Sequence, residues 1–204
     1  MLVTAESCER NKGPILEVLR RELANARAVL EIGSGTGQHA VYFAAHLPQL
    51  TWQASEIPAL LPALQARLQR EGARLPAPLA LDVRAAPWPG TPVDAIFSAN
   101  TLHIMGMDGV RAFFRGAGSA LPPSGTLCVY GPFNYGGAYT SESNAQFDAW
   151  LKARDPESAI RDFEALDALA HAAGLTLAAD HAMPANNRIL VWRRVLHARP
   201  VPPR

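Results

Sequence analysis

The sequence has few cysteines and no excess of charge of either sign. Cys8 and Cys128 are its two cysteines, and neither belongs to a CxxC or zinc-ligand pattern. HExxH is also absent, so a redox centre or a metal site is not expected. The 19 basic and 18 acidic side chains leave a formal net charge of +1. Proteins that bind nucleic acid through its phosphates normally carry a basic excess, so we expect no nucleic-acid partner.

Long apolar runs are missing as well. No run approaches the roughly 20 residues that span a bilayer. The first ten residues carry Glu6 and Glu9, where a signal peptide has a basic stretch followed by an apolar one. We therefore expect no membrane partner and a cytoplasmic location. With 49% apolar and 18% charged residues, the chain is expected to fold. We predict one domain over residues 1–197 and a frayed, proline-rich tail over residues 198–204.

Strands and helices are predicted to alternate along most of the chain. Alternation through the first 130 residues predicts parallel pairing in a doubly wound α/β sheet. The last two strands are separated by residues 184–188 alone, which is too short for a parallel crossover, so we expect an antiparallel pair. The predicted helices cover 11–24, 38–46, 60–71, 107–120, 144–154 and 162–173, and the predicted strands cover 28–32, 50–55, 78–82, 93–97, 126–130, 175–183 and 189–195.

A glycine-rich turn follows the first predicted strand. In a doubly wound sheet, ligands bind in the crevice outside the carboxyl ends of the strands. Gly33, Gly35 and Gly37, with Ser34 between the first two, permit positive φ and close approach of a ligand. The phosphate-binding pattern GxxxxGK[ST] occurs nowhere, and the third glycine comes one residue too early for the dinucleotide pattern GxGxxG. Glu31, just before the turn, suits an ammonium-bearing ligand better than a diphosphate.

Acidic residues end three successive predicted strands. Glu31 ends the first, Glu56 follows the second, and Asp82 ends the third with Val83 after it. A carboxylate at Glu56 can accept both hydroxyls of a ribose, while Asp82 can accept from an exocyclic amine and Val83 can pack on a purine. Together they favour a nucleoside with a cationic tail, such as S-adenosylmethionine. Taken singly, the glycine turn could be only a tight connection, Glu56 an exposed loop acid, and Asp82 a cap of the following turn.

The segment Glu31-Ile-Gly-Ser-Gly-Thr-Gly37 resembles the first motif of class I S-adenosylmethionine-dependent methyltransferases. More specifically, the chain resembles a poorly characterised methyltransferase-like family, long labelled as a domain of unknown function. The resemblance covers nearly the whole chain and implies a Rossmann-like, seven-stranded, mostly parallel sheet whose last strand is antiparallel. The sequence departs from the family pattern at Ser55-Glu56, where Asp is usual, and at Met105-Gly-Met107, where Trp is usual. The matching stretches are 9–12, 31–43, 81–83, 94–104, 130–133, 154–156 and 183–187.

The segment after the fourth predicted strand carries the predicted catalytic residues. In a methyltransferase fold this segment passes beside the sulfonium, so we expect Asn100 to line the cofactor and acceptor pocket. His103 is a predicted general base, because an unperturbed histidine titrates near neutral pH; the alternative is packing or capping at a helix start. The Asn-Pro-Pro-aromatic motif of enzymes that methylate base or glutamine nitrogens is absent, which again disfavours a nucleic-acid substrate.

Two further groups of residues are predicted near the ligands. Arg10 and Asn11, placed before the first helix, could bind the methionine carboxylate or close a lid, although they could also be ordinary surface residues. Tyr130, Phe133 and Asn134 follow the fifth strand and could form walls for a small acceptor. The alternative places Tyr130 and Phe133 in the core.

The leading hypothesis is methyl transfer from S-adenosylmethionine to a small-molecule acceptor. A non-catalytic S-adenosylmethionine-binding or interaction module is the alternative, and the absence of an acceptor pocket would favour it. A short-chain dehydrogenase needs a Tyr-x-x-x-Lys pair, and neither Lys12 nor Lys152 has a tyrosine four residues before it. The sequence leaves the oligomeric state open.

Overall fold

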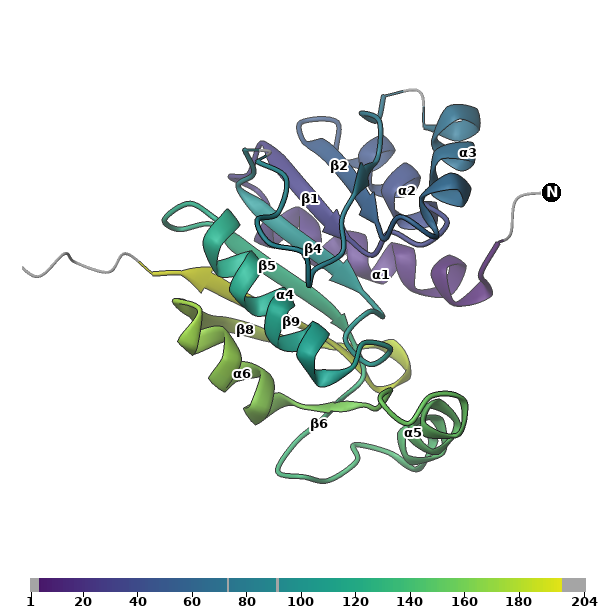
Figure 1. Ribbon diagram of the computed structural model, residues 1–204, viewed down its shortest axis with the longest axis vertical. Coiled ribbons are helices and arrows are strands. Elements are labelled where there is room, and N and C mark those ends of the chain that lie inside the picture. The colour runs from purple at the N-terminus through teal and green to yellow at the C-terminus, as the bar shows by residue number, and fades with distance from the viewer. Residues whose placement is uncertain (1–3, 73, 91, 196–204) are drawn as a thin grey trace, which may run out of the picture.

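The computed structural model describes residues 4–72, 74–90 and 92–195, which form a sheet covered by helices on both faces (Figure 1). The end of the predicted domain at residue 197 and the predicted tail over 198–204 lie outside the described residues. Within these residues, no helix is long and apolar enough to cross a membrane.

Seven strands form the main sheet in the order β3-β2-β1-β4-β5-β9-β8. The first five pair in parallel, whereas β9, the last strand of the chain, is antiparallel to both of its neighbours, β5 and β8. This arrangement confirms the predicted fold class. The strands are β1 (Ala28–Ile32), β2 (Thr51–Glu56), β3 (Leu79–Ala80), β4 (Ala95–Ala99), β5 (Thr126–Gly131), β8 (Leu175–Met183) and β9 (Asn187–Arg194).

Each face of the sheet has its own hydrophobic core. Central strands such as β4 are apolar on both faces, as expected where helices cover both sides of a parallel sheet. Phe97 points to the core beneath α1, α2 and α3, whereas Ile96 points to the core beneath α4 and α6. The helices are α1 (Glu6–Glu22), α2 (Gln38–His46), α3 (Leu61–Glu71), α4 (Met107–Ala120), α5 (Glu142–Arg154), α6 (Phe163–Ala172) and the 3-10 turn η1 (Pro184–Asn186).

The start of the first helix was predicted wrongly. The prediction placed Pro14 in the first turn, but α1 begins at Glu6 and Pro14 lies inside the helix. Glu6 and Glu9 occupy the first turn, where the helix dipole favours acidic side chains. As a consequence, Arg10 and Asn11 belong to the helix rather than preceding it.

Two smaller differences concern strands. A two-stranded parallel sheet, formed by β6 (Phe133–Asn134) and β7 (Arg161–Asp162), was not predicted. The third strand was predicted over 78–82 but has only two residues, because Asp82 leaves the ladder to form a turn with Arg84. Asp82 and Val83 therefore lie in a loop at the end of the strand.

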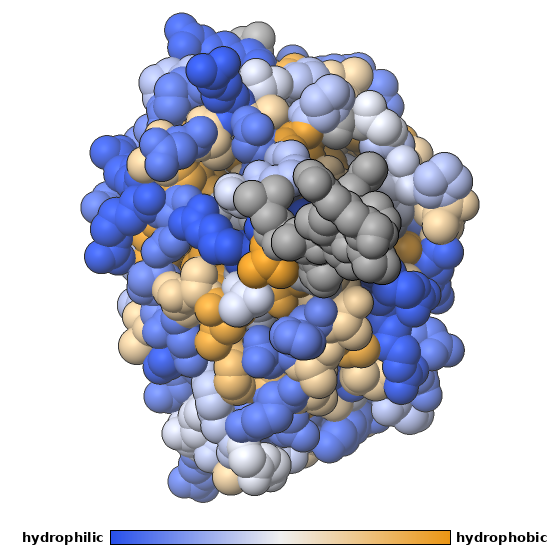
Figure 2. Space-filling model, turned by 90° about the vertical axis from the view of Figure 1, so that its left-hand side faces the viewer, coloured by the Kyte–Doolittle hydropathy of each residue, from blue (hydrophilic) through white to orange (hydrophobic). Residues whose placement is uncertain are grey.

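The parallel strands all point toward one end of the molecule, near the N-terminal end of α1 (Figure 1). The side of the molecule at the opposite ends of these strands is largely hydrophilic, with smaller apolar areas between the polar residues (Figure 2). The sheet thus positions the predicted site at the carboxyl ends of β1, β2 and β4.

Candidate cofactor site

A cavity of about 770 Å³ lies at the carboxyl ends of β1, β2 and β4. Its size falls within the range of small-molecule sites. The loops after these strands form most of its wall, and the first turns of α1 and α2 close it. Seven residues predicted to contact the cofactor line it: Gly33, Ser34, Gly35, Glu56, Asp82, Val83 and Asn100.

The glycine turn needs its glycines for different reasons. Gly33, Gly35 and Gly37 all have positive φ, between 57° and 84°, as predicted. A Cβ at Gly33 would lie 2.4 Å from Cγ2 of Thr101, and one at Gly37 would lie 2.7 Å from Cδ1 of Leu64. A Cβ at Gly35 would meet no atom within 4 Å. Gly35 therefore leaves its backbone open to a ligand, whereas Gly37 does not line the cavity and serves the packing of α3.

Glu56 joins the end of β2 to the glycine turn. Its Oε2 accepts a hydrogen bond from the backbone N–H of Gly35 at 2.7 Å, and its Oε1 accepts from the N–H of Ile57 at 2.8 Å. The residue is only 7% exposed, so it is not an ordinary loop acid. Each carboxylate oxygen has lone-pair capacity beyond its one backbone bond, and a ligand in the cavity can use it.

Asp82 caps a turn and also lines the cavity. Its carboxylate caps its own turn, accepting from the backbone N–H of Arg84 at 3.0 Å. It also accepts from the Arg84 guanidinium at 3.1 and 3.2 Å. These bonds lower the pKa of Asp82, mainly through the Arg84 side chain, so the carboxylate stays ionised where it lines the cavity.

Glu31 lies beneath the glycine turn and does not line the cavity. It is 2% exposed, and its Oε2 accepts a hydrogen bond from Nε1 of Trp52 at 3.0 Å. Burial raises the pKa of Glu31 to about 7, against hydrogen bonds from Trp52 and Ser34 that lower it. The carboxyl group thus supports the turn from below.

Asn100 lies on the cavity wall directly after β4. It has a φ of 59°, a conformation that asparagine tolerates better than most residues. Its backbone N–H donates to the carbonyl of Tyr130 at 2.9 Å. The structure thus brings Asn100 into the predicted position.

His103 lies near Asn100 in sequence but outside the residues that line the cavity. Its ring packs edge-on against Phe147, with centroids 5.3 Å apart. Burial, with the nearby Arg161 charge, lowers the pKa of His103 to about 4. The imidazole is therefore neutral at neutral pH.

The loop that carries His103 is held by the segment before α6. The Arg161 side chain donates to the carbonyl of Leu102 at 3.1 Å and also to the carbonyls of Met105 and Glu157. The backbone N–H of Ala159 donates to the carbonyl of His103 at 3.0 Å. These bonds fix Ile104 and Met105, which line the cavity.

The remaining predicted residues do not line the cavity. Arg10 is exposed and pairs with Glu6 at 3.3 Å.

Tyr130 and Phe133 are buried in the two cores, as the alternative interpretation proposed. Asn134 is buried, and its side-chain oxygen has no hydrogen-bond partner among the residues the structure describes. Asn11 does not line the cavity, but its Oδ1 lies 2.7 Å from Nε2 of His39, which does.

Residues 3–194 match the family described as "Protein of unknown function (DUF938)". The chain belongs to this family. Solved methyltransferase structures share its fold, which is that of class I S-adenosylmethionine-dependent methyltransferases.

Three such structures illustrate the likeness. An O-methyltransferase family protein from Burkholderia thailandensis has 18% identity and a TM-score of 0.78, covering 90% of this chain and 56% of its own. An O-methyltransferase family 2 protein from Planctomyces limnophilus, in complex with apigenin, has 19% identity and a TM-score of 0.78, covering 91% and 56%. Human N-acetylserotonin methyltransferase, in complex with S-adenosylmethionine, has 15% identity and a TM-score of 0.74, covering 93% and 58%. The chain thus spans a little more than half the length of these proteins.

Several cavity residues of this family member were not predicted. Ser7 and Cys8 line the cavity because α1 begins earlier than expected. His39 lines it from the first turn of α2. Its position two residues after Gly37 was a usable signal, since the helix that follows the glycine turn starts at the crevice.

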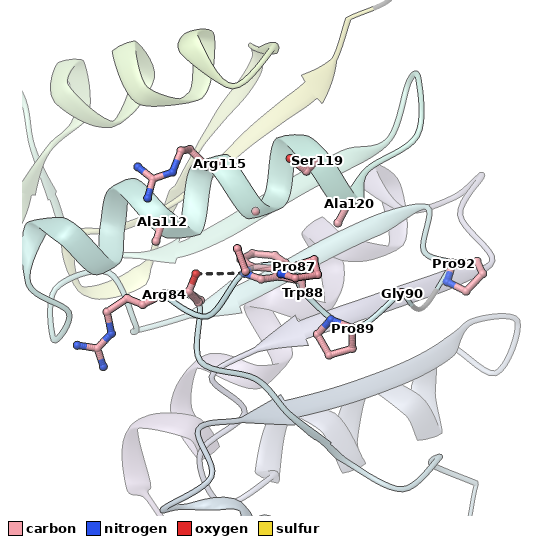
Figure 3. Close-up of a pocket in the computed structure, with 13 residues that line it drawn as sticks. Arg84, Pro87, Trp88, Pro89, Gly90, Pro92, Ala112, Arg115, Ser119 and Ala120 are labelled. Atoms are coloured by element: carbon pink, nitrogen blue, oxygen red, sulfur yellow. Dashed lines mark hydrogen bonds between the residues drawn. The ribbon is translucent and has the colours of Figure 1, made fainter.

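A second cavity, of about 820 Å³, is lined by the loop that runs from Val83 to Pro92 and by α4. Trp88 packs so closely on α4 that a Cβ at Gly116 would lie 2.1 Å from its ring. Its Nε1 donates to the carbonyl of Val83 at 3.2 Å, and Arg84 and Arg115 extend away from the ring (Figure 3). Trp88 therefore braces the loop that carries Asp82 and Val83.

Proposed function

We propose that this chain binds S-adenosylmethionine in the 770 Å³ cavity and methylates a small-molecule acceptor. The observation that carries the proposal is the placement of Glu56, Gly35 and Asp82 on one cavity at the carboxyl ends of the strands. The shared methyltransferase fold supports it.

The residues present suit the cofactor. Glu56 would hold the ribose hydroxyls, and Asp82 would accept from the exocyclic amine of adenine. Val83 would pack against the purine, and Gly35 leaves room for the backbone to approach the ligand. When bound, S-adenosylmethionine supplies a methyl group that its sulfonium already activates.

The charge of the lining also suits a cationic ligand. Arg84 is the one cation among the described residues that line the cavity, and Asp82 occupies its guanidinium. Carboxylates in excess over cations attract a sulfonium and an ammonium, whereas they repel a di- or triphosphate; here Asp82 pairs with Arg84 and Asp108 with Arg111. The carboxylates in the lining are Glu56, Asp82, Asp108, Asp155 and Glu157.

The chain's own contribution is to bind and orient the two ligands and to exclude water, because the methyl group arrives activated. We propose that Asn100, on the cavity wall, orients the acceptor through its amide. The role of His103 as a general base stays a prediction; its ring lies outside the residues that line the cavity, and its lowered pKa makes it a weaker base than an exposed histidine.

Calorimetric titration tests the proposal directly. We expect S-adenosylmethionine and S-adenosylhomocysteine to bind the wild-type protein, and NAD and ATP not to bind. Glu56→Ala removes charge-assisted hydrogen bonds worth about 1.5–3 kcal/mol each, so affinity for S-adenosylhomocysteine should fall at least about tenfold. Glu17→Ala, on the exposed face of α1, is the matched control and should bind normally.

Two results would contradict the proposal. One is binding of NAD or ATP as tight as that of S-adenosylmethionine. The other is unchanged affinity in a Glu56→Ala protein whose circular dichroism spectrum is that of the wild type.

A further inference from the structure

His39 is a buried histidine on the wall of the cavity, and the proposed roles above do not use it. It lies in the first turn of α2 and is 6% exposed. Its ring stacks on Phe43 with centroids 5.3 Å apart and meets Phe97 of β4 edge-on at 6.3 Å. These aromatic contacts hold the imidazole in one orientation.

The neighbours of His39 determine which ring nitrogen carries the hydrogen. Nε2 lies 2.7 Å from Oδ1 of Asn11. Burial raises the pKa of the Tyr130 hydroxyl, and an interaction with the Asn11 side chain opposes this shift. The Asn11 Oδ1 therefore accepts from His39, because an amide oxygen only accepts. Nε2 is the protonated nitrogen, and Nδ1 keeps its lone pair.

That Nδ1 atom is available to a ligand. Among the residues that the structure describes, the hydrogen bond of the His39 side chain is made by Nε2 and not by Nδ1, and the buried residue lines the cavity. Burial lowers the pKa of His39 to about 4, against the nearby Glu9 charge that raises it. The nitrogen therefore remains a hydrogen-bond acceptor at neutral pH.

The contacts of His39 place its ring away from the nucleoside end of the cavity. Glu56 and Asp82 mark that end, at β2 and β3. The contacts of His39 lead the other way, to Phe97 of β4 and through Asn11 to Tyr130 of β5. In the sheet order, β4 and β5 lie on the opposite side of β1 from β2 and β3. A bound nucleoside with a tail would direct its tail toward His39.

We propose that His39 borders the methyl-transfer end of the cavity and presents Nδ1 there as a hydrogen-bond acceptor, so that the methylated group is a hydroxyl or an amine rather than a carboxylate. This inference rests on the proposed function. A hydroxyl or amine can donate to Nδ1, which aligns its own lone pair with the methyl group. On transfer, the methyl–sulfur bond would break as the new bond forms, S-adenosylhomocysteine would leave, and the proton of the hydroxyl or amine would pass by way of Nδ1 to solvent. A carboxylate has no hydrogen to donate, and the acidic lining repels it.

The binding of two cofactor analogues tests this inference without a known acceptor. Sinefungin carries an amine where S-adenosylmethionine carries the reactive methyl, and S-adenosylhomocysteine carries nothing there. Wild-type protein should bind sinefungin about tenfold more tightly than S-adenosylhomocysteine, as one hydrogen bond to a charged group allows. His39→Phe, which keeps an aromatic ring but no nitrogen, should abolish this preference and change S-adenosylhomocysteine affinity less than about threefold.

Two more variants complete the experiment. His39→Leu should behave like His39→Phe, and it provides a second measurement if either substitution disturbs the fold. His171→Leu, on the exposed side of α6, should retain the wild-type preference.

Each other outcome overturns the inference in a recognisable way. If both analogues lose affinity equally in the His39 variants, His39 holds a part that they share. If the preference survives in the variants, or never exists in the wild type, Nδ1 does not face the methyl position. If the wild type binds neither analogue, the proposed function itself fails and this inference fails with it.

Discussion

Burial sets the charge of three side chains around the cavity. It raises the pKa of Glu31 to about 7 and lowers those of His39 and His103 to about 4. In each case the loss of water penalises the charged form. The two histidines are therefore neutral lone-pair carriers at neutral pH, while Glu31 changes charge close to it.

The titration of Glu31 should be visible in stability. Its pKa in the folded protein, about 7, lies above the ordinary value of 4.5. Its favourable contribution is therefore fully present below pH 4.5 and is lost as the pH rises through 7. Glu31→Gln keeps an oxygen for Trp52 and removes the titration. The free energy of unfolding of the variant, relative to wild type, should increase between pH 5 and 8 by up to about 1.4 kcal/mol per pH unit.

Urea unfolding at several pH values measures this difference. His39 and His103 titrate in both proteins, so their contributions cancel in the comparison. Glu17→Gln, at an exposed position of α1, should show the wild-type pH dependence. A Glu31→Gln protein with the same pH dependence as wild type would mean that the Glu31 carboxyl is already ionised across this range.

At the scale of elements, the first turn of α1 is fastened to the start of α2. The Gln38 Oε1 accepts from the backbone N–H of Ala5 at 2.6 Å, and its Nε2 donates to Oε1 of Glu9 at 3.2 Å. Ser7 and Cys8, between these contacts, line the cavity. Gln38 therefore holds a piece of the cavity wall in place.

Loss of this side chain should loosen the wall. In Gln38→Ala we expect amide hydrogen exchange of residues 5–10 to accelerate at least about fivefold, since a hydrogen bond contributes about 1 kcal/mol. Alanine favours helix more than glutamine, so faster exchange cannot come from a weaker α2. Exchange in β4 and β5 is the internal reference, and Gln146→Ala on α5 is the control. Unchanged exchange over 5–10 would show that other contacts hold the turn.

At the scale of the whole molecule, β9 joins the parallel part of the sheet to β8. Its Trp192 is fully buried and packs edge-on against Phe114 of α4, with centroids 5.5 Å apart. Trp192 Nε1 donates to Oδ1 of Asp167 on α6 at 2.9 Å. One side chain of the last strand thus connects the sheet to both helices of this face.

Removal of Trp192 should therefore destabilise the whole fold. Trp192→Ala leaves a large cavity and an unpaired Asp167, and substitutions of this kind cost about 3–5 kcal/mol. Trp150→Ala is the matched control, because Trp150 is 50% exposed and contacts Arg154 on its own helix; it should cost less than about 1 kcal/mol. Denaturant unfolding measures both, and equal losses would contradict the central role of Trp192.

The sequence by itself determined the order of the main elements and the edge of the sheet at which the candidate site lies. The helices at 38–46 and 107–120 and the strands at 28–32 and 175–183 occur as predicted, because apolar periodicity and turn residues are local properties of the chain. The turn at 33–37 and the acids at Glu56 and Asp82 could be placed together in advance, since the carboxyl ends of parallel strands share one edge.

The tertiary structure alone decided the orientation of the side chains that the sequence missed or misplaced. His39 was not predicted, because its orientation depends on Asn11 of α1 and Tyr130 of β5, far away in sequence. Glu31 belongs to the predicted motif, yet its carboxyl turns beneath the glycines toward Trp52 of β2. A strand pattern states that alternate residues face opposite sides of a sheet. The pattern does not predict which side chains pack on each side. Those tertiary contacts bury Glu31 against Trp52 and orient the His39 ring through Asn11.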